Sequence, residues 1–276
     1  MPELPEVETV VRDLRAAVVG RRVVGVELLR DSIVRYPDGA AFRKLLLGAF
    51  LANVERRGKF IHLGLGSDGG TALIVHLGMT GHLDVVGRRA SLRPHTHLRC
   101  RLDDGRELRF ADARRFGRVL LGPPDWLRSS GVLPPLGVEP LSADFTPAAL
   151  DAVLRSTRRT LKAALLDQRG VAGLGNIYVD EACFVARVRP QRRCQRLTRA
   201  ERARLHAAIV TVLERAVANR GTSIEDFRDI WDAPGNNQEE LRVYGRAEQP
   251  CLRCATPLRH AVVAGRGTTW CPSCQR

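Results

Sequence analysis

The sequence lacks any apolar run long enough to cross a bilayer, which argues against an integral membrane protein. Its first residues show neither the basic start nor the apolar stretch of a secretory signal, so we expect a cytoplasmic protein. A long basic amphipathic helix is also missing, which disfavours a membrane surface as the partner. Internal repeats and low-complexity segments are absent, while 44% of the 276 residues are hydrophobic. The chain is therefore expected to fold around a substantial core.

Lysine is scarce, since Lys44, Lys59 and Lys162 are the only lysines among 44 basic residues. A genome-wide bias towards arginine codons accounts for this scarcity. A lysine kept in such a chain is a candidate for a position that arginine cannot fill. The 30 acidic residues leave a net charge of +14, and the isoelectric point is about 10.6. This balance favours a polyanionic partner, with nucleic acid first.

The N-terminal sequence MPELPEVET admits two interpretations. In the first, it is only a helix start, because Pro5 suits the first helical position and Glu6 offsets the positive end of the helix dipole. In the second, the terminus is reactive, because removal of Met1 would leave Pro2 with a free secondary amine close to Glu3 and Glu6. These residues alone do not decide between the two.

The character of the chain changes near residues 131–141, a segment rich in proline and glycine that is typical of a linker. Before it, an amphipathic helix is predicted over residues 5–18, followed by short strand-like runs separated by turn residues. This pattern favours an antiparallel sandwich or barrel over alternating strands and helices. The runs are RRVVGVELL, KFIHLGL, TALIVHL, HLRCRL, ELRFA and RVLLG, with a short helix near 40–47 between the first two.

After the linker the pattern becomes helical, so the fold class is expected to be α+β. Short helices are predicted over residues 147–155, 159–168 and 176–186. A longer helix should start at Thr198, where T-R-A-E forms a capping box, and end before Gly221. We therefore predict three parts: a β-rich N-terminal domain over 1–135, a helical domain over 136–245 and a cysteine-bearing tail over 246–276.

The tail contains a C-x2-C pair, sixteen intervening residues and a second C-x2-C pair. This spacing predicts a hairpin whose two turns place four thiolates around one Zn²⁺ ion. Sulfur fills all four positions and leaves none for a bound water, so the zinc should be structural. The arginines around it suit a phosphate-facing hairpin, although a protein-binding zinc ribbon is an alternative. The four expected ligands are Cys251, Cys254, Cys271 and Cys274.

Three other segments are candidates for nucleic-acid contacts. GVAGLGN at 170–176 has the wrong glycine order for a dinucleotide fold, so we expect no nucleotide cofactor; it is either a phosphate-facing or a simple tight turn before Asn176. HLGMTG at 76–81 and DARRFG at 112–117 place an apolar side chain and arginines on loop tips, as in proteins that open a base step. Packed hairpin residues are the alternative for both loops. His95 and His97 have no partners at metal spacing, so they are interpreted as structural or phosphate-facing.

Taken together, these motifs resemble those of formamidopyrimidine-DNA glycosylase, a family of bacterial base-excision repair enzymes. The resemblance covers nearly the whole chain, and its motifs occur in the expected order. They are PELPEVET, the lysine of RGKF, HLGMTG, DARRFG, GLGNIYVDE, VYGR and the four-cysteine zinc finger. The resemblance implies a β-sandwich carrying an N-terminal helix, a helix–two-turn–helix domain and a zinc-finger hairpin. It also implies damaged double-stranded DNA as the partner of a monomeric enzyme that has no membrane partner.

The resemblance assigns the catalytic residues at the N-terminus. After loss of Met1, Pro2 is the nucleophile that attacks C1′, expels the damaged base and initiates β- and δ-elimination at the abasic sugar. An α-amino group suits this role, because its reference pKa of ~8 lies well below the ~10.4 of lysine. Glu3 is the acid that helps to open the sugar ring, and Glu6 orients the terminus and caps the helix. Lys59 is a proton donor and phosphate contact during elimination.

The remaining roles concern the DNA. The resemblance places Lys162 near the bound lesion and gives Met79, Arg114 and Phe116 the task of filling the void left by the base. The expected DNA contacts are Met79, His95, Arg114, Arg115, Phe116, Asn176 and Arg266.

The chain departs from the family in the loop that covers the lesion, at about residues 221–240. Relatives often carry an aromatic pair after Pro-Gly, whereas this chain has Asn236 and Asn237, which leaves the preferred damaged base open. Three alternatives remain: an endonuclease VIII-like glycosylase for oxidised pyrimidines, a non-catalytic zinc-ribbon DNA-binding protein and a zinc-dependent phosphodiesterase. The PELPE start favours the purine branch over the first. The closed four-sulfur site argues against the last.

Overall fold

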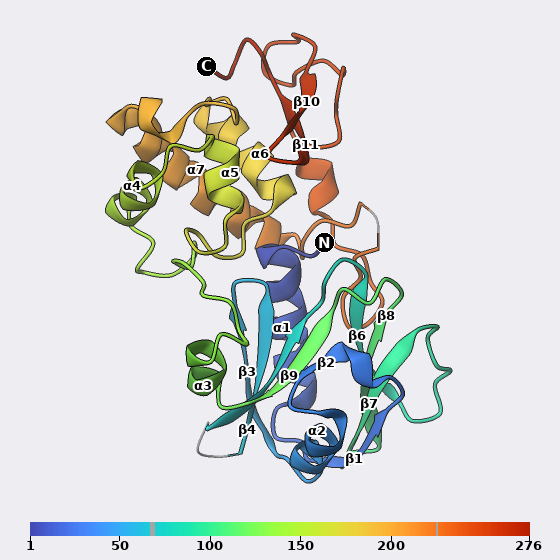
Figure 1. The fold of residues 1–276 in the computed structure, drawn as a ribbon. Coiled ribbons are helices and arrows are strands. Elements are labelled where there is room, and N and C mark those ends of the chain that lie inside the picture. The colour runs from blue at the N-terminus through green and yellow to red at the C-terminus, as the bar shows by residue number, and fades with distance from the viewer. Residues whose placement is uncertain (67–69, 225) are drawn as a thin grey trace. The chain divides into compact units, whose positions relative to one another are not determined.

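The computed structural model describes residues 1–66, 70–224 and 226–276 (Figure 1). The chain forms two compact units. The first consists of Met1–Pro135 with Arg220–Asn236, and the second of Leu136–Asn219 with Asn237–Arg276. Residues 220–236 thus belong to the N-terminal unit although they follow the helical region in sequence. The three-part division predicted from the sequence stays a prediction.

Helix α1 (Leu4–Val18) confirms the amphipathic helix expected at the N-terminus. Its apolar face is fully packed, since Val7, Val11 and Leu14 are each 0% exposed. Pro5 lies in the first turn, where its missing N–H costs no helical hydrogen bond. The helix therefore joins the core of the first unit with the residues of the PELPE motif at its first turn.

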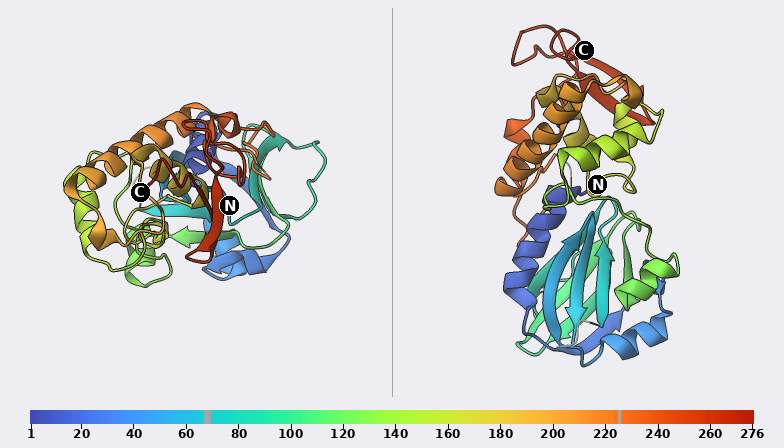
Figure 2. Two further views of the ribbon diagram at one scale, coloured as in Figure 1. Left: turned by 90° about the horizontal axis from the view of Figure 1, so that it is seen from above. Right: turned by 90° about the vertical axis from the view of Figure 1, so that its left-hand side faces the viewer.

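The first unit is a β-sandwich, as predicted. One sheet has the strand order β1-β7-β8-β6 and the other β2-β9-β5-β4-β3, and apolar residues from both sheets and from α1 form one core. The two layers are visible in Figure 2. The strands pair in the antiparallel way that was predicted, except that β2 pairs with β9 in parallel. The strands are β1 (Val23–Leu28), β2 (Val34–Tyr36), β3 (Leu51–Arg57), β4 (Phe60–Leu65), β5 (Thr71–His76), β6 (Gly81–Gly87), β7 (Thr96–Leu102), β8 (Arg106–Asp112) and β9 (Arg118–Gly122).

Two short helices complete the sandwich. Helix α2 (Gly39–Leu46) confirms the helix expected near 40–47, and its N-cap Asp38 accepts hydrogen bonds from the amides of Ala40 and Ala41. Helix α3 (Pro124–Ser129) was not predicted from the sequence.

The second unit contains four α-helices, two short 3-10 helices (Cys194–Arg196 and Asn237–Glu240) and a hairpin among its described elements. Threonines cap three of the helices through their side chains, namely Thr146, Thr160 and Thr198. These caps fix the helix starts close to the predicted positions, and Thr198 forms the expected capping box with Glu201. The elements are α4 (Pro147–Arg155), α5 (Leu161–Leu166), α6 (Asn176–Ala186), α7 (Arg199–Ala218), β10 (Arg259–Val263) and β11 (Arg266–Trp270). None of the described helices is long and apolar enough to cross a membrane.

Candidate active site and zinc centre

The N-terminal residues of the first unit are buried around the start of α1. Pro2 is buried, and Glu3 and Glu6 are only 3% and 2% exposed. Glu3 is the N-cap residue and forms a reciprocal capping box with Glu6, in which the Glu3 amide donates to Glu6 Oε2 over 2.8 Å. The helix-start interpretation is therefore confirmed. It does not exclude a reactive terminus, because the same contacts hold Pro2 and Glu3 in one place.

Lys59 lies in the tight turn between β3 and β4, directly after Gly58, whose φ of 56° suits glycine. Its side chain is only 5% exposed. The positive charge of Lys59 also affects the pKa of His76, the last residue of β5. The pKa of His76 is lowered to about 4, chiefly by burial and in addition by the charges of Arg118 and Lys59. His76 is therefore neutral at pH 7, and its Nδ1 accepts a hydrogen bond from the Gly78 amide over 3.1 Å.

The loops HLGMTG and DARRFG lie against each other. Gly78 has a φ of 65°, and a Cβ there would lie 2.4 Å from the backbone nitrogen of Gly117. Asp112, which is 1% exposed, holds both loops: its carboxylate accepts hydrogen bonds from Thr80 Oγ1 at 2.5 Å and from the Gly117 amide at 2.7 Å. Sequence reasoning missed this role of Asp112, because its partners come from two different loops.

The candidate wedge residues are presented by these loops. Met79 is half-buried and Arg114 and Arg115 are exposed. Phe116 is 52% exposed, with the guanidinium carbon of Arg114 4.9 Å from its ring centre. An exposed aromatic ring beside an arginine on a loop can enter a base step; the void-filling role of these residues stays a prediction.

The two histidines near β7 differ in their surroundings. His95 is exposed with a φ of 61°, whereas His97 is 5% exposed and its Nε2 lies 2.9 Å from the carbonyl oxygen of Asp112. His97 is therefore structural. A phosphate contact remains a prediction for His95.

In the second unit, the two predicted phosphate contacts come from α6 and the hairpin. Asn176 begins α6, and its Nδ2 donates to the Gly267 carbonyl over 3.0 Å. Its Oδ1 is buried without a hydrogen-bond partner among the described residues. Arg266 is exposed where β11 begins. One short contact therefore ties the start of α6 to the residue that follows Arg266.

Lys162 on α5 is fully buried in the second unit. Its Nζ lies 2.6 Å from Asp180 Oδ1 and donates to the Gly267 carbonyl over 3.1 Å, while Asp180 Oδ2 accepts from the Thr269 amide. The pKa of Asp180 is raised to about 6, because the effect of burial exceeds the opposing effect of the Lys162 charge. The pair joins α5, α6 and β11. Its predicted nearness to a lesion stays a prediction.

Glu181, which follows Asp180 on α6, binds the backbone at the start of the VYGR segment (residues 243–246). Its carboxylate accepts hydrogen bonds from the amides of Arg242, Val243 and Tyr244 at 2.8 to 2.9 Å, and the side chain is 4% exposed. Burial raises its pKa, and these three amides oppose that effect. Sequence reasoning did not single out this residue.

We expect Glu181→Ala to lower the free energy of unfolding by about 3 kcal/mol, because three amides lose their acceptor and each unmet buried group costs roughly 1–3 kcal/mol. Denaturant unfolding measures the change. Glu214→Ala, at an exposed position of α7, is the matched control and should change stability by less than about 0.5 kcal/mol. Equal stability of both variants would show that water replaces the carboxylate.

The four cysteines of the tail come together as predicted. Their Sγ atoms lie within 4.8 Å of one another, and those of Cys254 and Cys271 are 3.5 Å apart. Zn–S bonds of about 2.3 Å place tetrahedral sulfurs about 3.8 Å apart, so the donor set fits Zn²⁺ in both chemistry and spacing. These residues would hold a structural zinc at the base of the β10–β11 hairpin.

Three family models match successive parts of this chain. They are the formamidopyrimidine-DNA glycosylase N-terminal domain over residues 1–119, the formamidopyrimidine-DNA glycosylase H2TH domain over 136–228 and the zinc finger found in FPG and IleRS over 248–276. The chain belongs to the formamidopyrimidine-DNA glycosylase family. The family match and the four-sulfur cluster both indicate a structural zinc.

Curated members of the family are similar along the full chain. The formamidopyrimidine-DNA glycosylase of Symbiobacterium thermophilum is 49% identical over 276 residues, which cover all of this chain and 89% of that protein. That of Cytobacillus firmus is 42% identical, with both chains fully covered.

Solved structures of family members have the same fold. A complex between Lactococcus lactis Fpg and DNA containing an abasic site has a TM-score of 0.92 at 34% identity, with 99% of each chain covered. The MutM (Fpg) protein of Thermus thermophilus has a TM-score of 0.89 at 42% identity, covering 99% of this chain and 98% of that one. The α+β fold inferred from the sequence is confirmed.

Proposed function

We propose that this protein is a DNA repair glycosylase that removes oxidised purines, such as 8-oxoguanine and formamidopyrimidines, from duplex DNA and then cleaves the abasic site. Family membership supports the reaction class. The observation that carries the proposal is the buried N-terminus, where Pro2 and Glu3 are held at the first turn of α1.

The reaction starts when the Pro2 nitrogen, freed by loss of Met1, attacks C1′ with its lone pair. Glu3 protonates the ring oxygen O4′ as the C1′–O4′ bond opens, and this step assists the departure of the base. The bond from C1′ to the base breaks, and the base leaves with the proton that the Pro2 nitrogen gives up, so that a cationic iminium between Pro2 and C1′ remains. The iminium makes the C2′ proton acidic, so the 3′ phosphate leaves by β-elimination and the 5′ phosphate by δ-elimination. Lys59 is proposed to supply a proton and contact a phosphate during these steps.

The remaining residues would hold the duplex. Met79, Arg114 and Phe116 are proposed to fill the void left by the base, with Arg114 facing the orphaned cytosine, and His95 and Arg115 to contact DNA beside them. Asn176 and Arg266 would bind phosphates. The zinc, when bound, supplies no reaction step and fixes the hairpin that carries Arg266.

The chain would act as a monomer in the cytoplasm, bound to the nucleoid. We also propose three domains, over residues 1–135, 136–245 and 246–276.

Borohydride trapping tests this proposal. The protein, with its N-terminus confirmed as Pro2, is incubated with a duplex that carries one 8-oxoguanine opposite cytosine, and the cross-linked peptide is sequenced by mass spectrometry. We expect a covalent adduct at Pro2. A duplex with guanine at that position is the control and should give none. An adduct only with an oxidised-pyrimidine duplex would replace the substrate class, and no adduct with either would overturn the enzymatic proposal.

A further inference from the structure

The carboxylate of Glu6 joins two parts of the first unit that are 216 residues apart in the chain. Its Oε2 accepts the Glu3 amide over 2.8 Å, and its Oε1 accepts the Thr222 amide over 2.7 Å. Glu6 and Thr222 are 2% and 4% exposed. The two oxygens thus accept hydrogen bonds from two buried amides that belong to different parts of the chain.

The backbone next to Thr222 can approach Glu6 only because residue 221 is glycine. Gly221 has a φ of 81°, and a Cβ there would lie 2.9 Å from Glu6 Oε1 and 3.1 Å from the Glu6 Cα. The backbone is packed closely here a second time, since a Cβ at Gly235 would lie only 2.2 Å from the Gly221 carbonyl oxygen. A side chain at 221 must therefore push the segment and the carboxylate apart.

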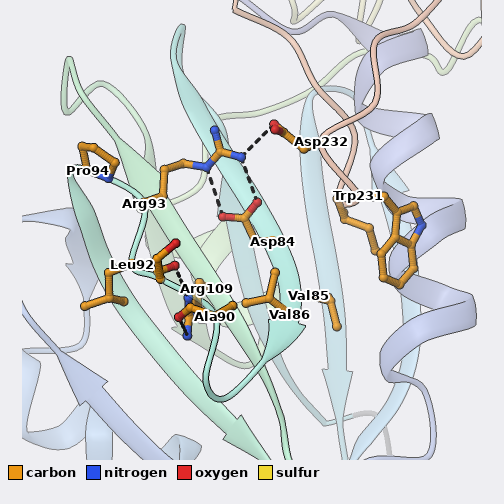
Figure 3. A pocket seen from close by; sticks show the side chains of 12 residues that line it. Asp84, Val85, Val86, Ala90, Leu92, Arg93, Pro94, Arg109, Trp231 and Asp232 are labelled. Carbon is orange, nitrogen blue, oxygen red and sulfur yellow. Dashed lines mark hydrogen bonds and ion pairs between the residues drawn. The ribbon is translucent and has the colours of Figure 1, made fainter.

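The rest of the segment Arg220–Asn236 is fastened to the same unit at several points. Arg220 pairs with Asp13 on α1 at 2.6 Å and with Asp229 at 2.5 Å. Arg93 pairs with Asp232 at 2.8 Å and with Asp84 on β6 at 3.3 Å (Figure 3).

The apolar side of the segment is anchored as well, since Ile230 is 1% exposed within the core of the sandwich. If a substitution displaces the first residues of the segment, these attachments prevent the whole segment from moving away with them. The displacement of the Thr222 amide therefore moves the Glu6 carboxylate.

We propose that Glu6 is a positioning residue that couples this segment to the reactive N-terminus. The inference rests on the proposed function, in which Pro2 forms the covalent adduct, and on the family resemblance, in which the loop at about residues 221–240 covers the lesion. Because one carboxylate holds both the Thr222 and Glu3 amides, a displaced segment moves the Glu3 backbone and with it the adjoining Pro2 nitrogen. The coupling therefore acts even on a substrate that has no base to cover.

An abasic duplex separates this coupling from direct contact between the segment and a base. We expect Gly221→Ala to slow single-turnover borohydride trapping on an abasic duplex by about tenfold or more, since small misplacements of a nucleophile carry large rate costs. Gly20→Ala is the matched control. Its φ of 83° imposes the same backbone strain at the other end of α1, and a Cβ there meets no atom of the described chain within 4 Å, so its trapping rate should stay within about twofold of the unchanged protein.

Glu6→Gln changes the other partner of the contact between Glu6 and the Thr222 amide, on helix α1. The amide keeps the shape of the side chain but replaces one acceptor oxygen with an NH₂ donor that faces a backbone N–H. We expect slower trapping here too. The double variant should be no slower than the slower single variant, because both changes break one contact. Thermal unfolding and duplex affinity of all four variants, compared with the unchanged protein, show whether they are folded.

Two outcomes would overturn the coupling. Gly221→Ala could trap the abasic duplex at the normal rate while releasing 8-oxoguanine slowly, which would show that the segment acts on the base alone. Multiplied rate losses in the double variant would show that Glu6 and the segment act independently. The absence of any adduct with the unchanged protein is a different result, because it overturns the proposed function itself.

Discussion

Glu3→Gln is expected to slow base release by roughly 10²- to 10⁴-fold, the usual contribution of a positioned general acid. Glutamine can still cap α1, since its side-chain oxygen accepts the same amide, but it cannot deliver a proton to the sugar ring. Glu3 is 3% exposed, so bulk water is poorly placed to replace it. Single-turnover release of 8-oxoguanine, read beside duplex affinity, measures the effect.

Pro2→Gly should lower base release at least as far and abolish most of the trapped adduct. Glycine keeps a terminal amine but lacks the ring that makes it secondary, and it leaves the chain before α1 free to adopt many conformations. Affinity for a damaged duplex should stay within about threefold, because Pro2 is assigned no phosphate or void-filling contact. Glu55→Gln, at an exposed position of β3, is the control for both substitutions. Parallel loss of binding and base release would contradict the roles assigned to Pro2 and Glu3.

Cys271→Ser should remove zinc from the protein and weaken duplex binding strongly. Cys271 is 0% exposed, and the hydroxyl of serine is a poor ligand for zinc. Because zinc binding to such sites is coupled to folding and amounts to roughly 10–16 kcal/mol, the hairpin should lose its fixed structure. Lys162 and Asn176 both donate hydrogen bonds to the Gly267 carbonyl of this hairpin. Without the zinc, this carbonyl and the neighbouring Arg266 would no longer be held in position.

The zinc content of the purified variant and its duplex affinity at two salt concentrations give the readout. Ser273→Ala is the matched control, since Ser273 lies between two ligands and its hydroxyl bonds to that of Thr256, which is not a zinc ligand. It should keep its zinc. A Cys271→Ser protein with full zinc content and normal affinity would show that the tail holds no metal through this residue.

Local signals in the sequence were enough for the helix starts and the zinc centre. Thr198 and Glu201 form a capping box within one turn, and the four cysteines lie in two turns at the ends of one hairpin. In such cases the interacting groups are close in sequence, so residue type and spacing carry the information. The catalytic roles came from the family resemblance and stay predictions.

Features that depend on distant residues could not be predicted. Strands β3 and β6 mix charged and apolar residues without a strict alternation, and only their neighbours in the sheets specify them. A lysine such as Lys162 is normally exposed, and its complete burial is explained by Asp180 and by Gly267, 105 residues away. The contact between Glu6 and Thr222 has no local signal at all.

The discontinuity of the first unit has a consequence for protein synthesis. At about 5–20 residues per second, a ribosome adds Thr222 roughly 10–40 s after Glu6. The Glu6 carboxylate therefore cannot bind the Thr222 amide until most of the chain has been synthesised. Ile230, which fills part of the core of the sandwich, arrives later still. During this interval the terminus is open to an aminopeptidase. Removal of Met1 can therefore precede the burial of Pro2, the proposed nucleophile.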